Sequence, residues 1–116
     1  NQIGDRGVAK LVQLLYDNRV LKSLNLSDNG AEIYSGKALK VLLSENNYLE
    51  HLDLSFNRLR MEGAGAVAEG LKRNMQLQTL NVAWNGFGDS QAVLAISEAM
   101  PTCGLKLLDM SHNRVD

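Results

Sequence analysis

One short stretch contains the three residue types that nucleophilic catalysis uses. His51, Asp53 and Ser55 alternate along the chain, so in a strand their side chains would share one face. A Ser-His-Asp site also needs a hydrogen-bonded chain of the three groups and oxyanion donors in a pocket. The rest of the sequence indicates an open sheet, which supplies no pocket, so we predict no catalytic residues and no small-molecule substrate here.

Other motifs give no better support for enzyme chemistry. Asp53 and Asp109 fall two strands apart, about 10 Å, which is too far for two carboxylates to share a proton. The pairs of glycines in Gly63-Ala-Gly65 and Gly86-Phe-Gly88 lack the Lys-Ser/Thr of a phosphate loop. Cys103 is the one cysteine, and no Cys/His spacing typical of a metal site occurs. The sequence therefore predicts a non-enzyme with no metal and no cofactor.

The overall charge excludes two classes of partner. Twelve basic residues against thirteen acidic ones give a formal charge of -1, so no general field attracts nucleic acid or an anionic membrane surface. No apolar run approaches the length of a membrane span. We therefore expect neither nucleic acid nor membrane as a partner, and a protein partner has to be recognised locally.

The whole chain repeats with a period of 28 residues. The asparagines at this spacing are Asn1, Asn29, Asn57, Asn85 and Asn113. The later four each close a copy of L-x-x-L-x-L-x-x-N. The third leucine of the motif is replaced by Val82 in the third copy and by Met110 in the fourth. The alternation in L-x-L is typical of a strand with one buried face. The sequence thus predicts four short strands within residues 21–29, 49–57, 77–85 and 105–113.

A helical spacing begins seven residues after each of the first four asparagines. Residues at i, i+3, i+4 and i+7 then form the stripe expected on a helix with one buried face. The predicted stripes are Val8, Leu11, Val12 and Leu15; Gly36, Leu39, Lys40 and Leu43; Ala64, Val67, Ala68 and Leu71; Ala92, Ala95, Ile96 and Ala99. Asp5 and Asp89 lie near helix starts, where a carboxylate complements the dipole, and Pro101 ends the fourth helix.

Units of this size must stack, because one strand and one helix cannot bury their apolar faces alone. Stacking gives an α/β solenoid with a parallel sheet in one layer and helices in the other. Helices are about 10 Å wide and strands about 4.8 Å apart, so the sheet should lie on the concave side. Ile3, Ala31, Leu59, Phe87 and Val115 should fill the core beneath the turns. We expect residues 1–116 to form one array of about four repeats without recognisable caps, a segment of a longer array.

These motifs resemble the leucine-rich repeat of the ribonuclease-inhibitor-like, intracellular subfamily. The resemblance covers all 116 residues. It implies a right-handed βα horseshoe in the cytoplasm that binds a protein partner on its concave face. Members include ribonuclease inhibitor, the sensor arm of nucleotide-binding immune receptors, the Ran GTPase-activating protein, and leucine-rich-repeat proteins of cilia and flagella. The cysteine-rich repeats of ribonuclease inhibitor are absent, since Asn closes every copy.

The recurring asparagines are interpreted as structural. A turn that leaves a strand exposes backbone N–H and C=O groups, and a buried Asn amide can both donate to and accept from them. We therefore expect Asn29, Asn57, Asn85 and Asn113 to form a ladder from repeat to repeat.

The x positions of the motif should point away from the core and align as columns across the sheet. The columns are Ser23, His51, Thr79 and Leu107; then Asn25, Asp53, Asn81 and Asp109; then Ser27, Ser55, Ala83 and Ser111. At the strand exits lie Asp28, Phe56, Trp84 and His112. Because Trp84 replaces no leucine of the motif, it belongs to the rim and not to the core.

Aromatic side chains beside acids and imidazoles are typical of a protein-binding surface. The predicted contact set is Asp28, His51, Asp53, Phe56, Trp84, Asp109 and His112. A simpler interpretation is that Phe56 and Trp84 shield the turn below them.

Three functions remain open at this point. The first is a non-catalytic scaffold that binds a protein on its strand face. The second is a GTPase-activating module, as the resemblance to the Ran activator allows, and the third is a structural segment of a larger ciliary or immune-receptor assembly. An added rate of GTP hydrolysis by a cognate GTPase would distinguish the second function, and silent concave-face mutations would indicate the third.

Overall fold

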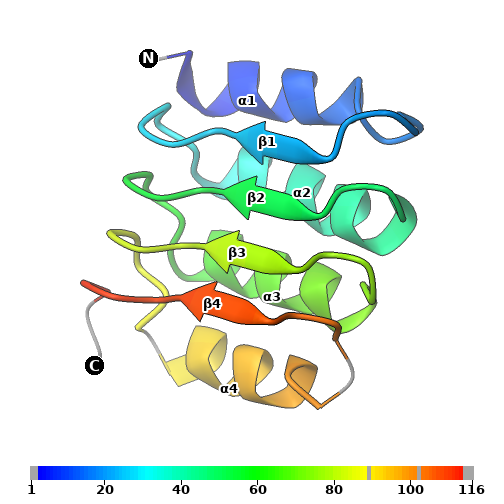
Figure 1. The fold of residues 1–116 in the computed structure, drawn as a ribbon. Coiled ribbons are helices and arrows are strands. Elements are labelled where there is room, and N and C mark those ends of the chain that lie inside the picture. The colour runs from blue at the N-terminus through cyan, green and yellow to red at the C-terminus, as the bar shows by residue number, and fades with distance from the viewer. Residues whose placement is uncertain (1–2, 89, 102, 114–116) are drawn as a thin grey trace.

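Helices and short strands alternate along the chain in two layers, with the strands in one and the helices in the other (Figure 1). The computed structural model describes residues 3–88, 90–101 and 103–113. Its elements are α1 (Gly4–Gln13), β1 (Ser23–Asn25), α2 (Ile33–Glu45), β2 (His51–Asp53), α3 (Glu62–Lys72), β3 (Thr79–Asn81), α4 (Ser90–Ala99) and β4 (Leu107–Asp109). As predicted, α4 ends before Pro101.

The strands form one parallel sheet in the order β1-β2-β3-β4. The register advances by one repeat per strand, so that residues with the same place in the motif face each other. Leu24 pairs with Leu52, Leu52 with Leu80, and Leu80 with Leu108. The 28-residue period therefore fixes both the pairing and the columns of side chains across the sheet, which confirms the predicted parallel sheet and helix layer.

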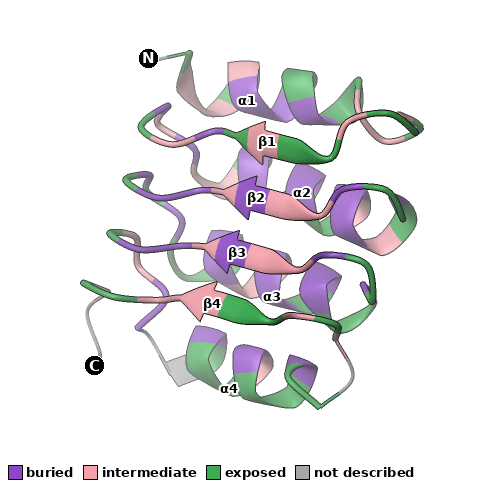
Figure 2. Ribbon diagram, in the orientation of Figure 1, coloured by how far each residue is buried: buried purple, intermediate pink, exposed green. Residues whose placement is uncertain are grey.

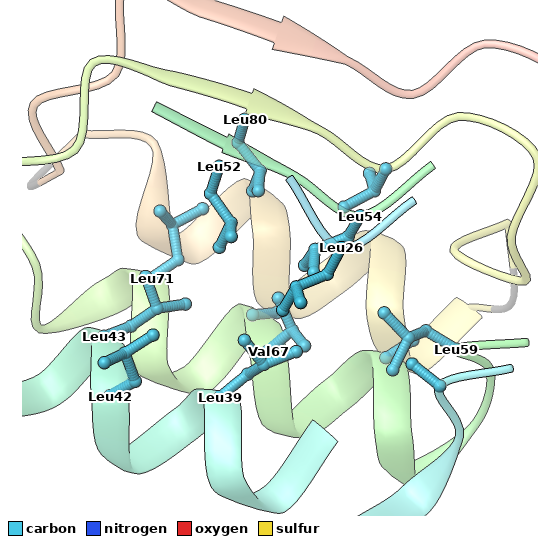
Figure 3. Packing of buried hydrophobic residues seen from close by; sticks show 14 of the residues in the cluster. Leu26, Leu39, Leu42, Leu43, Leu52, Leu54, Leu59, Val67, Leu71 and Leu80 are labelled. Carbon is cyan, nitrogen blue, oxygen red and sulfur yellow. The ribbon is translucent and has the colours of Figure 1, made fainter. Parts of the chain in front are cut away.

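The core lies between the two layers. Leu52 and Leu80 of the sheet point toward Leu43 and Leu71 of the helices (Figure 3), and all four are almost completely buried. Figure 2 shows the same division along the ribbon, with buried residues on the helices and on the central strands. Burial of each leucine side chain contributes about 2 kcal/mol, so the repeated motif itself supplies the main stabilisation.

Two predicted core positions are exposed at the α1 end of the array. Ile3 is 49% exposed, although Ala31, Leu59 and Phe87 at equivalent positions are completely buried. Leu11, in the predicted helical stripe, is 36% exposed. Both lie on the first repeat, where α1 packs against α2 alone among the described helices. Of the remaining predictions, Asn1, Asp89 and Val115 lie outside the described residues.

Asp5 lies at a helix start as predicted, and it also stabilises the next helix. It lies in the first turn of α1, but its carboxylate accepts hydrogen bonds from backbone N–H groups at the start of α2. The N–H groups of Glu32 and Ser35 donate to Oδ1 at 2.7 and 2.8 Å, and that of Tyr34 donates to Oδ2 at 3.0 Å. The first N–H groups of a helix have no partner within the helix, so Asp5 caps α2 from the preceding repeat.

Replacing Asp5 with alanine should lower the free energy of unfolding by about 1–2 kcal/mol at neutral pH, as for the loss of an N-cap. Partial burial opposes ionisation, but hydrogen bonds from Ser35, Glu32 and Tyr34 hold the pKa of Asp5 below its ordinary value of 3.8. A lowered folded-state pKa gives stability that is complete above 3.8 and is lost as the pH falls through that folded-state pKa. The difference between wild type and variant should therefore narrow in acid.

Urea unfolding near pH 7 and near pH 3 measures both effects, with the exposed Asp17→Ala as control. Equal midpoints for the two variants at neutral pH would show that Asp5 does not cap α2.

Candidate functional site

The central column of the sheet face consists of four residues that each use one side-chain oxygen in the fold. Asn25, Asp53, Asn81 and Asp109 lie opposite one another in register. In each case Oδ1 accepts a hydrogen bond, at 2.9 Å, from the backbone N–H two residues further on. Asparagine and aspartate thus form the same turn here, and the negative charge at Asp53 and Asp109 is not needed for it.

The residues with catalytic side-chain types do not form a Ser-His-Asp chain. Ser55 donates a hydrogen bond to Asp53 Oδ1 at 2.7 Å, while His51 Nδ1 lies 2.9 Å from Thr79 Oγ1 on the neighbouring strand. Histidine is therefore hydrogen-bonded across the sheet and serine to the acid, in place of a serine-histidine pair.

The third predicted column is partly buried, which corrects the expectation that it faces outward. Ser55 is 6% and Ala83 is 5% exposed, whereas Ser111 is exposed. Each strand ends two residues earlier, at Asp53, Asn81 or Asp109. Strict strand alternation does not extend beyond these strand ends.

Three rings stack in a column at the strand exits, and we call Phe56, Trp84 and His112 the ring column. The Phe56 and Trp84 ring centroids lie 5.5 Å apart with an interplanar angle of 11°. The Trp84 and His112 centroids lie 4.1 Å apart at 13°. Phe56 is 56% and Trp84 48% exposed, and His112 is exposed as well. Parallel pairing of the strands thus places three aromatic rings from separate repeats on one solvent-facing ridge.

The backbone under the ring column has a left-handed conformation. Asp28 has φ = 55°, and Phe56, Trp84 and His112 each have φ = 58°. Bulky residues with positive φ are uncommon and cost about 1–2 kcal/mol each. The N–H groups of Phe56 and Trp84 donate to the carbonyl oxygens of Ala83 and Ser111, so bonds to the following repeat hold this conformation. The fold imposes the turn, while the sequence places rings where Gly or Asn would be less strained.

Below the rings, the asparagines form hydrogen bonds between consecutive repeats. Asn57 Oδ1 accepts from the N–H groups of Asn29 and Ala31 at 3.1 and 2.9 Å. Asn113 repeats the pattern one step on, accepting from Asn85 and Phe87 at 3.1 and 2.8 Å. Asn29, Asn57, Asn85 and Asn113 also donate through their amides to backbone carbonyls. These contacts are structural and support the turns on which the ring column stands.

A second asparagine series, at the other end of the strands, was missed in the sequence. Asn18, Asn46 and Asn74 recur every 28 residues, so the signal was the same spacing. Asn46 Oδ1 accepts from the N–H groups of Tyr48 and Leu49 at 2.8 and 3.0 Å. Its amide donates to the carbonyl of Asn18 at 2.9 Å. The starts of β2 and β3 are therefore also fixed to the preceding repeat.

Neighbouring groups set the charge state and the ion pairing of residues on the sheet face. Hydrogen bonds from the Ser111 hydroxyl and N–H, with a smaller contribution from His112, hold the pKa of Asp109 below 3.8. Asp109 is accordingly ionised at neutral pH. At the start of the strands, Lys22 pairs with Glu50 at 3.7 Å. Among the described residues, no group of three or more His, Cys, Asp or Glu could hold a metal ion.

Three stretches of the chain, residues 17–30, 45–68 and 73–90, match the family model described as Leucine Rich repeat. They contain β1, β2 and β3 with the turns that follow. No curated protein matches the chain.

The matched repeats, the parallel open sheet and the layer of helices define an α/β leucine-rich-repeat solenoid. The three matches support a leucine-rich-repeat protein. Such repeats commonly bind proteins and are typically non-catalytic. In the part of the chain that the structure describes, no helix is both long and apolar enough to cross a membrane.

Proposed function

We propose that the chain is a non-catalytic scaffold that binds a protein partner on the sheet face and the ring column. The proposed contact residues are Asp28, His51, Asp53, Phe56, Trp84, Asp109 and His112. We also propose that residues 1–116 form a single array of about four repeats.

The observation on which this proposal depends is the exposed ring column. A side chain needed only to cover its own turn would be expected to bury most of its surface, yet Phe56 and Trp84 keep about half of theirs in solvent. Aromatic side chains give a large contact area at small entropic cost, and tryptophan is enriched among the residues that dominate protein interfaces. Stacking restricts the rings before a partner arrives, which lowers the ordering cost of binding.

The finer family assignment is also a proposal. The ribonuclease-inhibitor-like subfamily is supported by the 28-residue period and by a helix of ten or more residues in every repeat. That subfamily supports a cytoplasmic location.

The test is affinity capture with the full chain from a native lysate. The Phe56→Ala, Trp84→Ala double variant should capture at least tenfold less partner than wild type. Truncation of aromatic residues that dominate an interface weakens the binding free energy by about 2 kcal/mol or more. Circular dichroism and the unfolding midpoint establish that the variant is folded.

The matched control is Met75→Ala, Leu94→Ala. Both side chains are apolar and well exposed, at 77% and 61%, but neither belongs to the ring column or the sheet face. Loss of the partner in the ring variant alone supports the proposal. Equal capture by wild type and the ring variant would show that the rings only cover their own turns.

A further inference from the structure

We propose that the ring column and the sheet face bind a positively charged segment of the partner protein. The inference rests on the proposed function, because it specifies the chemistry of the partner that this surface accepts.

The docking surface itself is defined by the ring column. Trp84 has Phe56 stacked on one side and His112 on the other, so a partner reaches mainly the edge of its indole. The ring position in the first repeat is occupied by Asp28, which has the same turn conformation as Phe56. The column of rings therefore ends at Phe56 on the side of the first repeat and is followed there by a carboxylate. A guanidinium or ammonium group interacts favourably with the face of an aromatic ring, here the face of Phe56 that is not stacked on Trp84, and with carboxylates.

The sheet face beside the rings is acidic. Its three columns and the strand-exit positions contain Asp28, Asp53 and Asp109 but no lysine or arginine. All of these positions lie in the described part of the chain. The nearest basic residues along the chain are Lys22 and Lys106, just before β1 and β4, and Arg58, two residues after Phe56, which pairs with Glu32 at 4.0 Å. The surface therefore has a local negative charge, although the whole chain is almost neutral.

The repeats themselves indicate that the turn does not need this charge. Asn25 and Asn81 accept the same 2.9 Å hydrogen bond as Asp53 and Asp109, at equivalent places in the sheet. The fold requires an oxygen acceptor at each site, and asparagine provides one without charge. Asp53 and Asp109 therefore add a negative charge to the surface beside the ring column, which selects a positively charged partner by complementarity.

The test titrates the full chain with a capped peptide of alternating glycine and arginine. Trp84 is the one tryptophan of the sequence, so its fluorescence reports on the ring column directly. A saturable change in that fluorescence is expected, weakening as salt is added. In Asp53→Asn, Asp109→Asn the affinity should fall about threefold or more, as expected for the loss of two exposed ion pairs. Thermal unfolding of this variant should match wild type, because asparagine retains the acceptor.

The reverse substitution is an internal control. Asn25→Asp adds a carboxylate to the same column and should strengthen binding of the arginine peptide. A capped peptide of alternating glycine and glutamate should leave Trp84 fluorescence unchanged. The inference is wrong if the arginine peptide does not bind, if the glutamate peptide binds equally well, or if the charge-neutral variant binds like wild type.

The natural partner separates this inference from the proposed function. Loss of the partner with Phe56→Ala, Trp84→Ala and also with Asp53→Asn, Asp109→Asn supports both. If the ring variant loses the partner and the charge-neutral variant keeps it, the surface binds a protein but not through positive charge. If neither variant loses the partner, the proposed function itself fails.

Discussion

Replacing Asn57 with leucine should lower the free energy of unfolding by about 3 kcal/mol or more, because several buried backbone groups lose their partners together. Asn57 is 8% exposed. Its oxygen accepts from Asn29 and Ala31, and its amide donates to the carbonyls of Leu26, Leu54 and Ser55 at 3.0, 2.9 and 3.2 Å. Leucine has a similarly branched side chain but can satisfy none of these groups. Urea unfolding followed by circular dichroism measures the loss.

The matched control is Asn47→Leu, the same change at an exposed position. It should shift the midpoint by no more than an ordinary surface substitution, about 0.5 kcal/mol. If Asn57→Leu shifts the midpoint equally little, the asparagine ladder does not stabilise the fold.

The same variant should also weaken the coupling between repeats. The stability of a repeat array is approximately a sum of repeat terms and neighbour interfaces, and Asn57 joins the turn after β1 to the turn after β2. Trp84 reports on the third repeat and on its stacking with the second and fourth, whereas circular dichroism reports on all the repeats. Transitions followed by the two signals should coincide in wild type and separate in the variant.

The period predicted most of the fold because one measurable spacing sets several structural features at once. A shift of 28 residues maps Ser23 on His51 and Leu24 on Leu52, and those pairs are the observed register. The same spacing aligned Phe56, Trp84 and His112, so the sequence could indicate a shared rim. It could not give the stacking distances, which depend on turn angles that no residue pattern specifies.

Contacts that depend on two repeats were missed in the sequence, and predictions were wrong for the residues that follow the end of a strand. Asp5 caps α2, which begins about one repeat further along the chain. The capping patterns that can be recognised in a sequence link residues a few positions apart at the start of one helix, so they do not predict this contact. Ser55 and Ala83 are buried because the strands end before them, and the length of a strand is not encoded in its alternation. The acidic character of the sheet face was visible in sequence, but the structural use of one oxygen per residue was not.

A glycine in α2 shows most clearly that a sequence pattern does not reveal contacts between repeats. Gly36 lies in the predicted helical stripe, where the equivalent residues are Val8, Ala64 and Ala92. The repeats alone therefore suggest that alanine is acceptable at this position. In the structure, a Cβ added to Gly36 would lie 2.5 Å from the carbonyl oxygen of Gly63 and 2.7 Å from its Cα. Real Cβ atoms do not approach backbone so closely, so α2 or the start of α3 has to move.

Gly36→Ala should accordingly destabilise the protein by about 2 kcal/mol, because the overpacking of one methyl exceeds the gain in helix propensity. Gly65→Ala is the matched control. Gly36 and Gly65 are each the fourth residue of their helices, α2 and α3, but a Cβ on Gly65 meets nothing within 4 Å. There the same substitution should stabilise the protein by about 0.5–1 kcal/mol.

Thermal and urea unfolding of the two variants side by side measure both changes. Opposite signs are expected from one chemical change at equivalent helix positions, so helix propensity alone cannot explain the result. A stabilising Gly36→Ala would mean that the α2 and α3 backbones can separate without cost. Because close approach of these helices sets how the two central repeats stack, the position of Phe56 relative to Trp84 would then be adjustable as well.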